Sequence, residues 1–529
     1  MPDKNSKNED RTVSGELTEE CNWKFNPALT AHSKTGDVFL DVTDQRVIPV
    51  LFIPGIMGSR LKQRGREKKV WDPPTGPEEA IGTLFKYLFK GTKTRVSELN
   101  PDRVEVARDM PAEHLSGGYH ANAEVLKKRG WGSVWPAGYF RIMEDLEKML
   151  TERKSAEERE NDKILHDPNE YGHKKSSSAI TLQEYKEKLL KYRFEVWGGG
   201  YNWLQSNDKS ADDLSKYIDE IIASYPDDVI NKAKKILVVT HSMGGLVARA
   251  ICTKGYAGKI LGVVHTVMPA TGAPATYKRM RAGFEGVGRM IMGRNAADVT
   301  GIMGGAQGAL ELLPFASYDD GKPWLFFPKE IKEREPTPLA LPAGGDPYSS
   351  IYQCAEWYGL VPYYYEGFKP SSDDRQSPRD KFNKMIDQVR KFHQQIENSY
   401  HPLTLALWGE FTSMKSWGKV VWKHLPYYQD PYYAPFLPSD EHGDDQRGTV
   451  TQGDHMADIQ KEDCPGDGTV PHLSARHPGK KGTGHFVHDQ NAPRYGSKSY
   501  EHSACFKEDN MCWSVKHSAA RIVLNTLEG

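Results

Sequence analysis

Residues 236–245 read I-L-V-V-T-H-S-M-G-G, an apolar run that ends in a short turn. The β-branched stretch from Ile236 to Thr240 is typical of a buried strand, and a helical pattern follows the turn as far as Ala250. Ser242 therefore stands where a strand turns into a helix. A nucleophilic serine needs such a strained turn, because the turn lifts its hydroxyl above the edge of the sheet. The stretch predicts Ser242 as a nucleophile; the alternative is a serine that caps a helix.

One position of this turn departs from the usual pattern. Small residues two before and two after the serine keep the strand and the helix from colliding. Gly244 meets that requirement, whereas Thr240 takes the place of the expected glycine. The strand–turn–helix setting therefore carries more of the prediction than the letters Ser-x-Gly, which are common by chance.

Strands and helices alternate along most of the chain. Strand candidates are Val47–Ile53, Tyr192–Trp197, Ile236–Thr240, Ile260–Val267 and Leu403–Trp408, and apolar helical faces run over Ile142–Leu150, Leu214–Ile222 and Val515–Val523. This alternation indicates βαβ units and a mainly parallel sheet. With the serine turn, it predicts the α/β class and an α/β-hydrolase fold with a mainly parallel central sheet.

A serine nucleophile needs a base and a carboxylate that orients the base, in the chain order Ser, Asp or Glu, His. The best acid candidate is Asp467, which lies between two glycines in C-P-G-D-G-T-V-P. A Gly-Asp-Gly sequence alone is usually just a turn. Asp454, Asp458 and Asp463 therefore remain competitors.

The candidate base is His502 in Y-E-H-S-A-C-F, because it directly precedes the closing helix, where the histidine loop of this fold belongs. His485 and His488 are rivals. His517 is a third rival, but it falls inside the helical stretch, where we expect an exposed surface histidine.

Acyl transfer also needs backbone N–H groups that stabilise the oxyanion. One donor is expected from Met243, directly after the nucleophile, and the other from the turn P-G-I-M-G-S at 54–59. Ile56 is the best-placed donor of that turn, and Met57 is next.

The composition excludes several classes of function. The net charge is −1, with 70 basic and 71 acidic residues, so we expect no nucleic-acid partner. The six cysteines lack metal-ligand spacing, and we expect no metal or cofactor; Cys505 and Cys512 are close enough in sequence to pair, with free thiols as the alternative. The N-terminus has no apolar core of a signal peptide, which predicts synthesis in the cytoplasm without one.

The spacing of the candidate residues predicts an insertion. Asp467 follows Ser242 by 225 residues, whereas His502 follows Asp467 by only 35. We expect a polar N-terminal arm over 1–45, a catalytic domain over 46–275 and 400–529, and a cap or lid insertion over 276–399. Within the insertion, the Gly/Met-rich stretch Gly283–Gly305 suits a hinged lid, or else ordinary cap core.

Several motifs resemble the lipase group that includes lecithin:cholesterol acyltransferase, lysosomal phospholipase A and the GPI-inositol deacylases. The motifs are P-G-I-M-G-S at 54–59, T-H-S-M-G-G at 240–245, G-D-G-T-V-P at 466–471 and L-S-A at 473–475. The resemblance implies Ser242 as nucleophile, Asp467 as acid and His502 as base, with Ile56 and Met243 in the oxyanion hole. The segment G-Y-N-W at 200–203 is similar to the family's Tyr-Asp-Trp, with Asn202 in place of the aspartate.

The stretches 267–284 and 500–506 most closely resemble the GPI-inositol-deacylase-like branch of bacterial type VI secretion lipase effectors. The resemblance implies a phospholipase A-type esterase that cleaves membrane phospholipids through an acyl-enzyme. It also implies a type VI secretion apparatus component and a periplasmic immunity protein as partners, and delivery to the periplasm of a target bacterium. The alternatives are a lipid acyltransferase, an intracellular housekeeping esterase and a catalytically silent lipid-binding protein of the same fold.

Overall fold

The structure is a computed structural model. It describes residues 11–17, 23–25, 38–41, 45–74, 97–111, 115, 122–151, 156–173, 178–227, 232–284, 296–327, 340–361, 377–425, 437–438, 450–452, 455–480, 484–488 and 499–527.

Six strands form the central sheet, in the order β20-β13-β10-β9-β4-β8. They are β4 (Arg46–Ile53), β8 (Tyr192–Gly198), β9 (Ile236–His241), β10 (Ile260–Thr266), β13 (Thr404–Gly409) and β20 (Gly484–His488). Each neighbouring pair is parallel. The mainly parallel sheet predicted from the alternation of strands and helices is confirmed.

Alternate residues of the inner strands β4 and β9 pack into two cores, one on each face of the sheet. Along β9, Ile236 and Val238 belong to one core, and Leu237 and Val239 to the other. Burial on both faces explains why this strand is apolar at successive positions rather than at every second one. The first core includes residues of α7 (Asn207–Ala223), α8 (Gly244–Thr253) and α13 (Pro378–Ile396). The second includes residues of α4 (Pro136–Thr151) and α16 (Asp509–Thr526).

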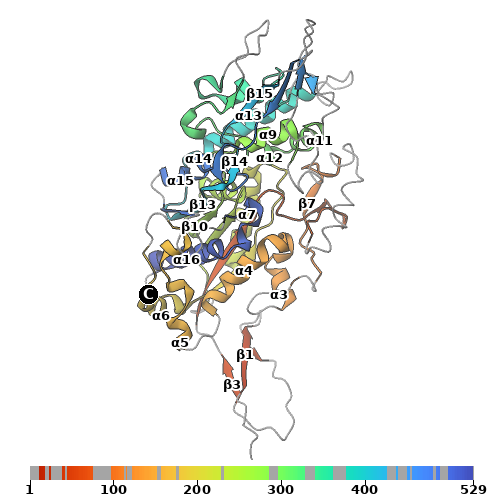
Figure 1. The fold of residues 1–529 in the computed structure, drawn as a ribbon. Coiled ribbons are helices and arrows are strands. Elements are labelled where there is room, and N and C mark those ends of the chain that lie inside the picture. The colour runs from red at the N-terminus through yellow and green to blue at the C-terminus, as the bar shows by residue number, and fades with distance from the viewer. Residues whose placement is uncertain are drawn as a thin grey trace, which may run out of the picture.

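A second sheet lies at one end of the molecule, together with α9 (Pro274–Ala282), α11 (Ala296–Met303) and α12 (Gln307–Leu310) (Figure 1). Its order is β12-β11-β15-β18-β17-β16. The strands are β11 (Leu325–Phe326), β12 (Ala340–Leu341), β15 (Val420–Leu425), β16 (Leu437–Pro438), β17 (Val450–Gln452) and β18 (His455–Ile459). This sheet therefore joins segments from both sides of residue 400, where we predicted the cap to end.

Three strands lie within the predicted polar arm, at the opposite end of the molecule (Figure 1). They are β1 (Arg11–Leu17), β2 (Trp23–Phe25) and β3 (Val38–Asp41). β1 pairs antiparallel with β2 and parallel with β3. The arm thus contains a small sheet of its own.

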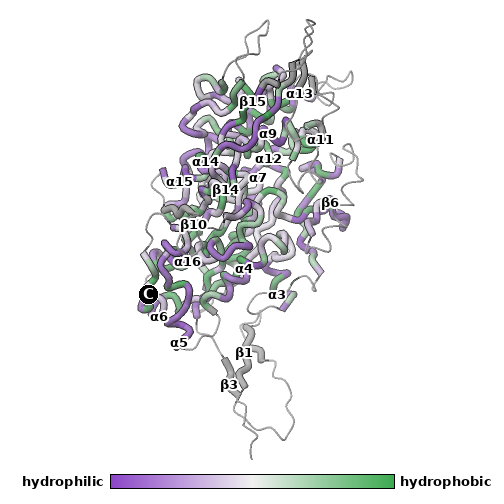
Figure 2. The backbone as a smooth tube through the Cα atoms, viewed as in Figure 1, coloured by the Kyte–Doolittle hydropathy of each residue, from purple (hydrophilic) through white to green (hydrophobic). Residues whose placement is uncertain are grey.

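Shorter elements lie outside the two six-stranded sheets. They are β5 (Leu61–Gln63), β6 (Lys69–Trp71), β7 (Val104–Val106), α3 (Ala123–Lys128), α5 (Ala156–Glu160), α6 (Leu182–Glu187), β14 (Phe411–Ser416), β19 (Cys464–Gly466), α14 (His472–Ala475), α15 (His477–Lys480) and the short 3-10 helix η12 (His502–Lys507). Figure 2 shows that α5 and α6, at the periphery, are largely hydrophilic. No helix among the residues described here combines the length and apolarity needed to cross a membrane.

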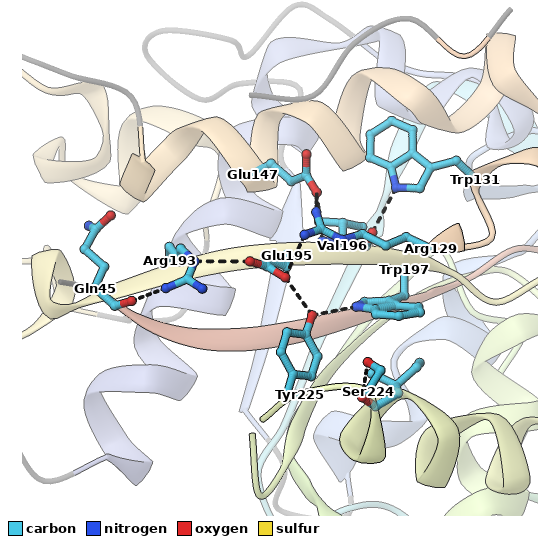
Figure 3. Close-up of polar contacts among 11 residues, drawn as sticks. Gln45, Arg129, Trp131, Glu147, Arg193, Glu195, Val196, Trp197, Ser224 and Tyr225 are labelled. Atoms are coloured by element: carbon cyan, nitrogen blue, oxygen red, sulfur yellow. Dashed lines mark hydrogen bonds and ion pairs between the residues drawn. The ribbon is translucent and has the colours of Figure 1, made fainter. Parts of the chain in front are cut away.

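A buried ionic network joins the edge strand β8 to α4 (Figure 3). Glu195 of β8 accepts hydrogen bonds from Arg193 (3.1 Å) and from the Tyr225 hydroxyl (2.8 Å), and its carboxylate lies 2.7 Å from Arg129. Arg129 also donates to Glu147 of α4, over 3.2 Å. Burial alone would raise the pKa of Glu195, but the charges of Arg129 and Arg193 outweigh it and hold this pKa below its usual value. The network therefore holds an ionised carboxylate between the sheet and the helix.

Candidate active site

Ser242 occupies a strained turn between β9 and α8. Its φ of 51° lies in the left-handed region, which residues other than glycine rarely adopt. Strain of this kind persists only where the surrounding structure enforces it. Here the chain passes very close to β4, because a Cβ atom on Gly244 would lie 2.4 Å from the carbonyl oxygen of Ile53. The glycine two residues after Ser242 is thus required by the backbone geometry.

The threonine two residues before Ser242 is accommodated by polar contacts. Thr240 is fully buried, and its hydroxyl lies 2.9 Å from Nδ1 of His265 on the neighbouring strand β10. The Thr266 hydroxyl donates to the carbonyl of Thr240 over 2.7 Å. Burial, with a smaller effect of the Arg249 charge, lowers the pKa of His265 to about 3. A neutral histidine therefore partners the hydroxyl that stands where a glycine was expected.

His502 lies between Ser242 and Asp467. Its Nε2 atom is 2.8 Å from the Ser242 Oγ, and its Nδ1 atom is 2.8 Å from Oδ2 of Asp467. All three side chains are buried. The backbone contributes as well, because the N–H of His502 donates to the carbonyl of Asp467 over 2.9 Å. The three candidate residues therefore form one continuous hydrogen-bonded chain.

The carboxylate of Asp467 is fixed by its own loop. Its Oδ1 atom accepts hydrogen bonds from the backbone N–H groups of Thr469 (3.0 Å) and Val470 (2.7 Å). Oδ2 is then directed at His502. In the Gly-Asp-Gly turn, Oδ2 of Asp467 thus contacts His502, while Oδ1 stabilises the turn through its backbone N–H groups.

The turn after β4 packs directly against the serine. The N–H of Gly58 donates to the carbonyl of Gly55, which closes a turn with Ile56 and Met57 in its centre. Met57 has a φ of 64°, and its carbonyl accepts a 2.7 Å hydrogen bond from the indole of Trp71. A Cβ atom on Gly55 would lie 3.0 Å from Cβ of Ser242. This close approach brings the expected oxyanion segment next to the nucleophile candidate.

Comparisons with known proteins show the family and the fold. A family model described as the PGAP1-like alpha/beta domain matches residues 206–291. A solved structure, "The crystal structure of Tle4-Tli4 complex", matches with 32% identity and a TM-score of 0.77, and the alignment covers 92% of this chain and 100% of that chain. The search of curated proteins gave no match. The chain belongs to the Tle4 family. The predicted α/β-hydrolase fold and the resemblance to GPI-inositol-deacylase-like type VI lipase effectors are confirmed, and the protein is a lipid hydrolase of this effector type.

Within this Tle4-family fold, the rival acids lie elsewhere. Asp463 accepts hydrogen bonds from the backbone of Gly418 (2.8 Å) and Lys419 (3.1 Å), and so it holds a turn. Asp458 belongs to β18 in the second sheet. Asp454 lies outside the described residues. Among the acid candidates that are described, Asp467 is the one that the structure brings to His502.

The rival bases belong to other elements of the fold than His502. His485 and His488 belong to β20, the edge strand, and their side chains are not among those described. His517 was expected on the surface, and this prediction is wrong: its side chain is fully buried. Residues 156–173 cover the side of α16 that the helical pattern alone leaves to solvent, and there Tyr171 stacks on Trp513, next to His517.

Asn202, which replaces an aspartate of the family motif, forms hydrogen bonds with two backbone groups. Its side-chain amide donates to the carbonyl of Pro101 over 2.9 Å, and its side-chain oxygen accepts from the N–H of Leu204 over 3.2 Å. An uncharged side chain serves both contacts, because one needs a donor and the other an acceptor. The substitution therefore fits the local structure.

The predicted lid lies partly outside the described residues, which exclude 285–295. Its described part forms α11, whose residues Val299, Ile302 and Met303 are buried in the first core. Cys505 and Cys512 are both free thiols. In the described part of the chain, no cluster of His, Cys, Asp and Glu side chains is arranged to hold a metal ion.

Two buried side chains next to the site were not found from the sequence. His241 directly precedes Ser242, and Tyr139 lies on α4 at 2% exposure. Tyr139 has no sequence signal beyond its place on an apolar helical face. His241 stands in the motif T-H-S-M-G-G, but the motif does not say what its ring contacts.

Proposed function

We propose that this protein is a phospholipase A-type esterase with Ser242, His502 and Asp467 as its catalytic triad. The observation that carries the proposal is the position of His502, whose two ring nitrogens lie 2.8 Å from the serine hydroxyl and from the aspartate carboxylate. That arrangement suits a general base that is oriented by a buried acid. The strained φ of Ser242 supports its assignment as the nucleophile.

The first half-reaction forms an acyl-enzyme. His502 takes the proton of the Ser242 hydroxyl through Nε2, and Oγ attacks the ester carbonyl carbon. The backbone N–H groups of Ile56 and Met243 stabilise the resulting oxyanion. The protonated His502 then gives its proton to the departing lysophospholipid oxygen, and the acyl group stays on Ser242. Asp467 keeps the Nδ1–H of His502 in place throughout.

The second half-reaction restores the serine. A water molecule gives a proton to His502 and attacks the acyl carbonyl, again with the oxyanion held by Ile56 and Met243. The serine oxygen leaves with the proton that His502 returns, and the fatty acid is released. Each turnover thus converts one phospholipid and one water into one lysophospholipid and one fatty acid.

The family supports the substrate and the biological setting of this proposal. We infer that the substrate is membrane phospholipid, that the type VI secretion apparatus delivers the chain to the periplasm of a target bacterium, and that the producing cell holds an immunity protein. The last inference rests on the relative Tle4, whose solved structure is a complex with Tli4.

Vesicles of phosphatidylethanolamine and phosphatidylglycerol test the reaction directly. The purified enzyme should release fatty acid and lysophospholipid in equal amounts, as measured by mass spectrometry, and Ser242→Ala should release neither. A fluorophosphonate probe should label the wild-type chain on Ser242. Labelling of another serine, or release of a phosphorylated head group instead of a fatty acid, would overturn the proposal. A vesicle experiment with added alcohol separates transfer from hydrolysis, because an acyltransferase would form the alcohol ester in preference to fatty acid.

A further inference from the structure

The ring of His241 has a fixed hydrogen-bonding arrangement. Its Nε2 atom lies 3.0 Å from the backbone carbonyl of His502, and its Nδ1 atom lies 3.2 Å from the hydroxyl of Tyr139. A carbonyl oxygen only accepts hydrogen bonds, so Nε2 must carry the ring proton. Nδ1 is then an acceptor, and the Tyr139 hydroxyl donates to it. His241 therefore holds the backbone of the proposed base from the position next to Ser242.

Tyr139 continues this contact to the turn after β4. Its hydroxyl oxygen accepts a hydrogen bond from the backbone N–H of Gly55 over 3.3 Å. The hydroxyl also fills the space beside the turn, because a Cβ atom on Gly58 would lie 2.4 Å from it. The rings of Phe52 and Phe506 pack around Tyr139, with centroids 5.0 and 6.2 Å away. The hydroxyl is thus fixed between the turn and His241.

We propose that Tyr139 and His241 are positioning residues that couple the oxyanion turn to the loop of the catalytic base. The two side chains join Gly55, one residue before Ile56, to the carbonyl of His502 through consecutive hydrogen bonds. This inference rests on the proposed function, since it assigns a role relative to that triad. Neither residue touches the reacting atoms. Their role is to hold the donors and the base in the relative geometry that the transition state needs.

The directions of these hydrogen bonds are stable during turnover. Burial, with a smaller effect of the nearby His502, lowers the pKa of His241 to about 3, so its ring stays neutral when His502 becomes charged. Burial raises the pKa of Tyr139, so its hydroxyl keeps the proton that it donates. The pair therefore orients both segments without exchanging protons with the reaction.

Tyr139→Phe removes the coupling and keeps the ring. We expect kcat for a soluble p-nitrophenyl ester to fall about 10- to 100-fold, because small misplacements of catalytic groups are this costly. The KM should change less than about threefold, since the variant alters geometry needed in the transition state rather than ground-state binding. Loss of folded protein would also lower the activity at an unchanged KM, so kcat is expressed per folded molecule, with the folded fraction measured by circular dichroism.

His241 offers a conservative variant. In His241→Gln, the side-chain amide N–H can still reach the carbonyl of His502, whereas His241→Leu has no donor. We expect His241→Gln to keep clearly more activity than His241→Leu. Adding Tyr139→Phe to His241→Leu should cost little more, because coupled residues show non-additive effects.

Tyr225→Phe is the matched control, because it removes the hydroxyl of another tyrosine, one that is partly buried and bonded to Glu195 in the ionic network (Figure 3). It should lower Tm and leave kcat near the wild-type value. The inference is overturned if Tyr139→Phe behaves like this control, or if the two His241 variants are equally active. Labelling of Ser242 by a fluorophosphonate in the wild type separates the coupling proposal from the triad proposal. If Ser242 is labelled and Tyr139→Phe has no effect on kcat, only the coupling is rejected. If Ser242 is not labelled, the triad is rejected.

Discussion

The Nε2 atom of His502 lies 2.8 Å from the Oγ atom of Ser242, although 260 residues separate the two in sequence. The parallel sheet explains this meeting. Ser242 follows the carboxyl end of β9, and Asp467 and His502 lie in loops that converge at the same edge. Ligands and substrates of open α/β sheets bind outside the carboxyl ends of the strands. The fold therefore assembles the site from three loops that contribute one side chain each.

Ser242→Ala should lower the esterase kcat by several orders of magnitude, because no other atom can form the acyl-enzyme. The fold should persist, since the hydroxyl contacts only His502 among the interactions described for this side chain. Steady-state kinetics and circular dichroism measure the two effects separately. A residual rate above about a tenth of the wild-type rate would exclude Ser242 as nucleophile.

Asp467→Asn should reduce kcat about 10³- to 10⁴-fold, because an amide next to Nδ1 favours the wrong tautomer of His502. Asp463→Asn is a matched control: Asp463 caps the turn at Gly418 and Lys419, so its loss should lower Tm and spare the rate per folded molecule. For the base, His502→Ala should lower kcat nearly as much as Ser242→Ala does. Full activity in Asp467→Asn would assign the acid role to another carboxylate.

The parts of the fold that follow from local pattern were predictable from the sequence. The apolar run before Ser242 is a buried strand, the glycine after it is needed for close approach to β4, and the Gly-Asp-Gly turn carries Asp467. The order of serine, acid and base along the chain, together with the place of His502 before the closing helix, then favoured His502 as the base. The strand, the glycine and the Gly-Asp-Gly turn are each visible in residues close to one another in sequence.

Features that depend on distant segments were missed. The contact of Thr240 with His265 requires the register of β9 and β10, and no local pattern gives that register. The burial of His517 requires residues 156–173 to fold over α16, whereas its place inside a helical stretch led us to expect an exposed histidine. The link from Gly55 through Tyr139 to His241 joins three elements in the same way. Sequence periodicity describes one face of one element at a time.

Stability should fall as the pH drops below about 6.5. Burial is the main cause that lowers the pKa values of His241, His265, His393 and His517 to about 3, from 6.5. Between these two pH values the unfolded chain binds protons that the native state does not. Each of these histidines therefore lowers the free energy of unfolding by about 1.4 kcal/mol for each unit by which the pH falls. Urea unfolding from pH 7 to 5 measures the slope. His517→Phe, which can keep the stacking on Trp513, should have a shallower slope, and an unchanged slope would contradict this account.

Glu195→Gln should destabilise the fold by about 3–5 kcal/mol, because it leaves Arg129 and Arg193 buried without a full counter-charge. Glu144→Gln on α4 is the control, since its ion pair with Lys148 is partly exposed and worth at most about 1 kcal/mol. Urea unfolding measures both variants. Equal midpoints for the two would show that the network in Figure 3 adds no net stability.

Toxicity should depend on the compartment that the enzyme reaches. The proposed delivery to the periplasm implies that the substrate is accessible from that side of the bacterial membrane. We therefore expect that fusion of a cleavable signal peptide, which sends the chain to the periplasm, makes expression toxic, and that the unfused chain is much better tolerated. Ser242→Ala with the same signal peptide controls for the load of export and should be harmless. Co-expression of a periplasmic immunity protein from the producing bacterium should restore growth. If the periplasmic form is harmless while cell extracts show full lipase activity, the effector setting is wrong for this chain, and an intracellular housekeeping esterase becomes the better account.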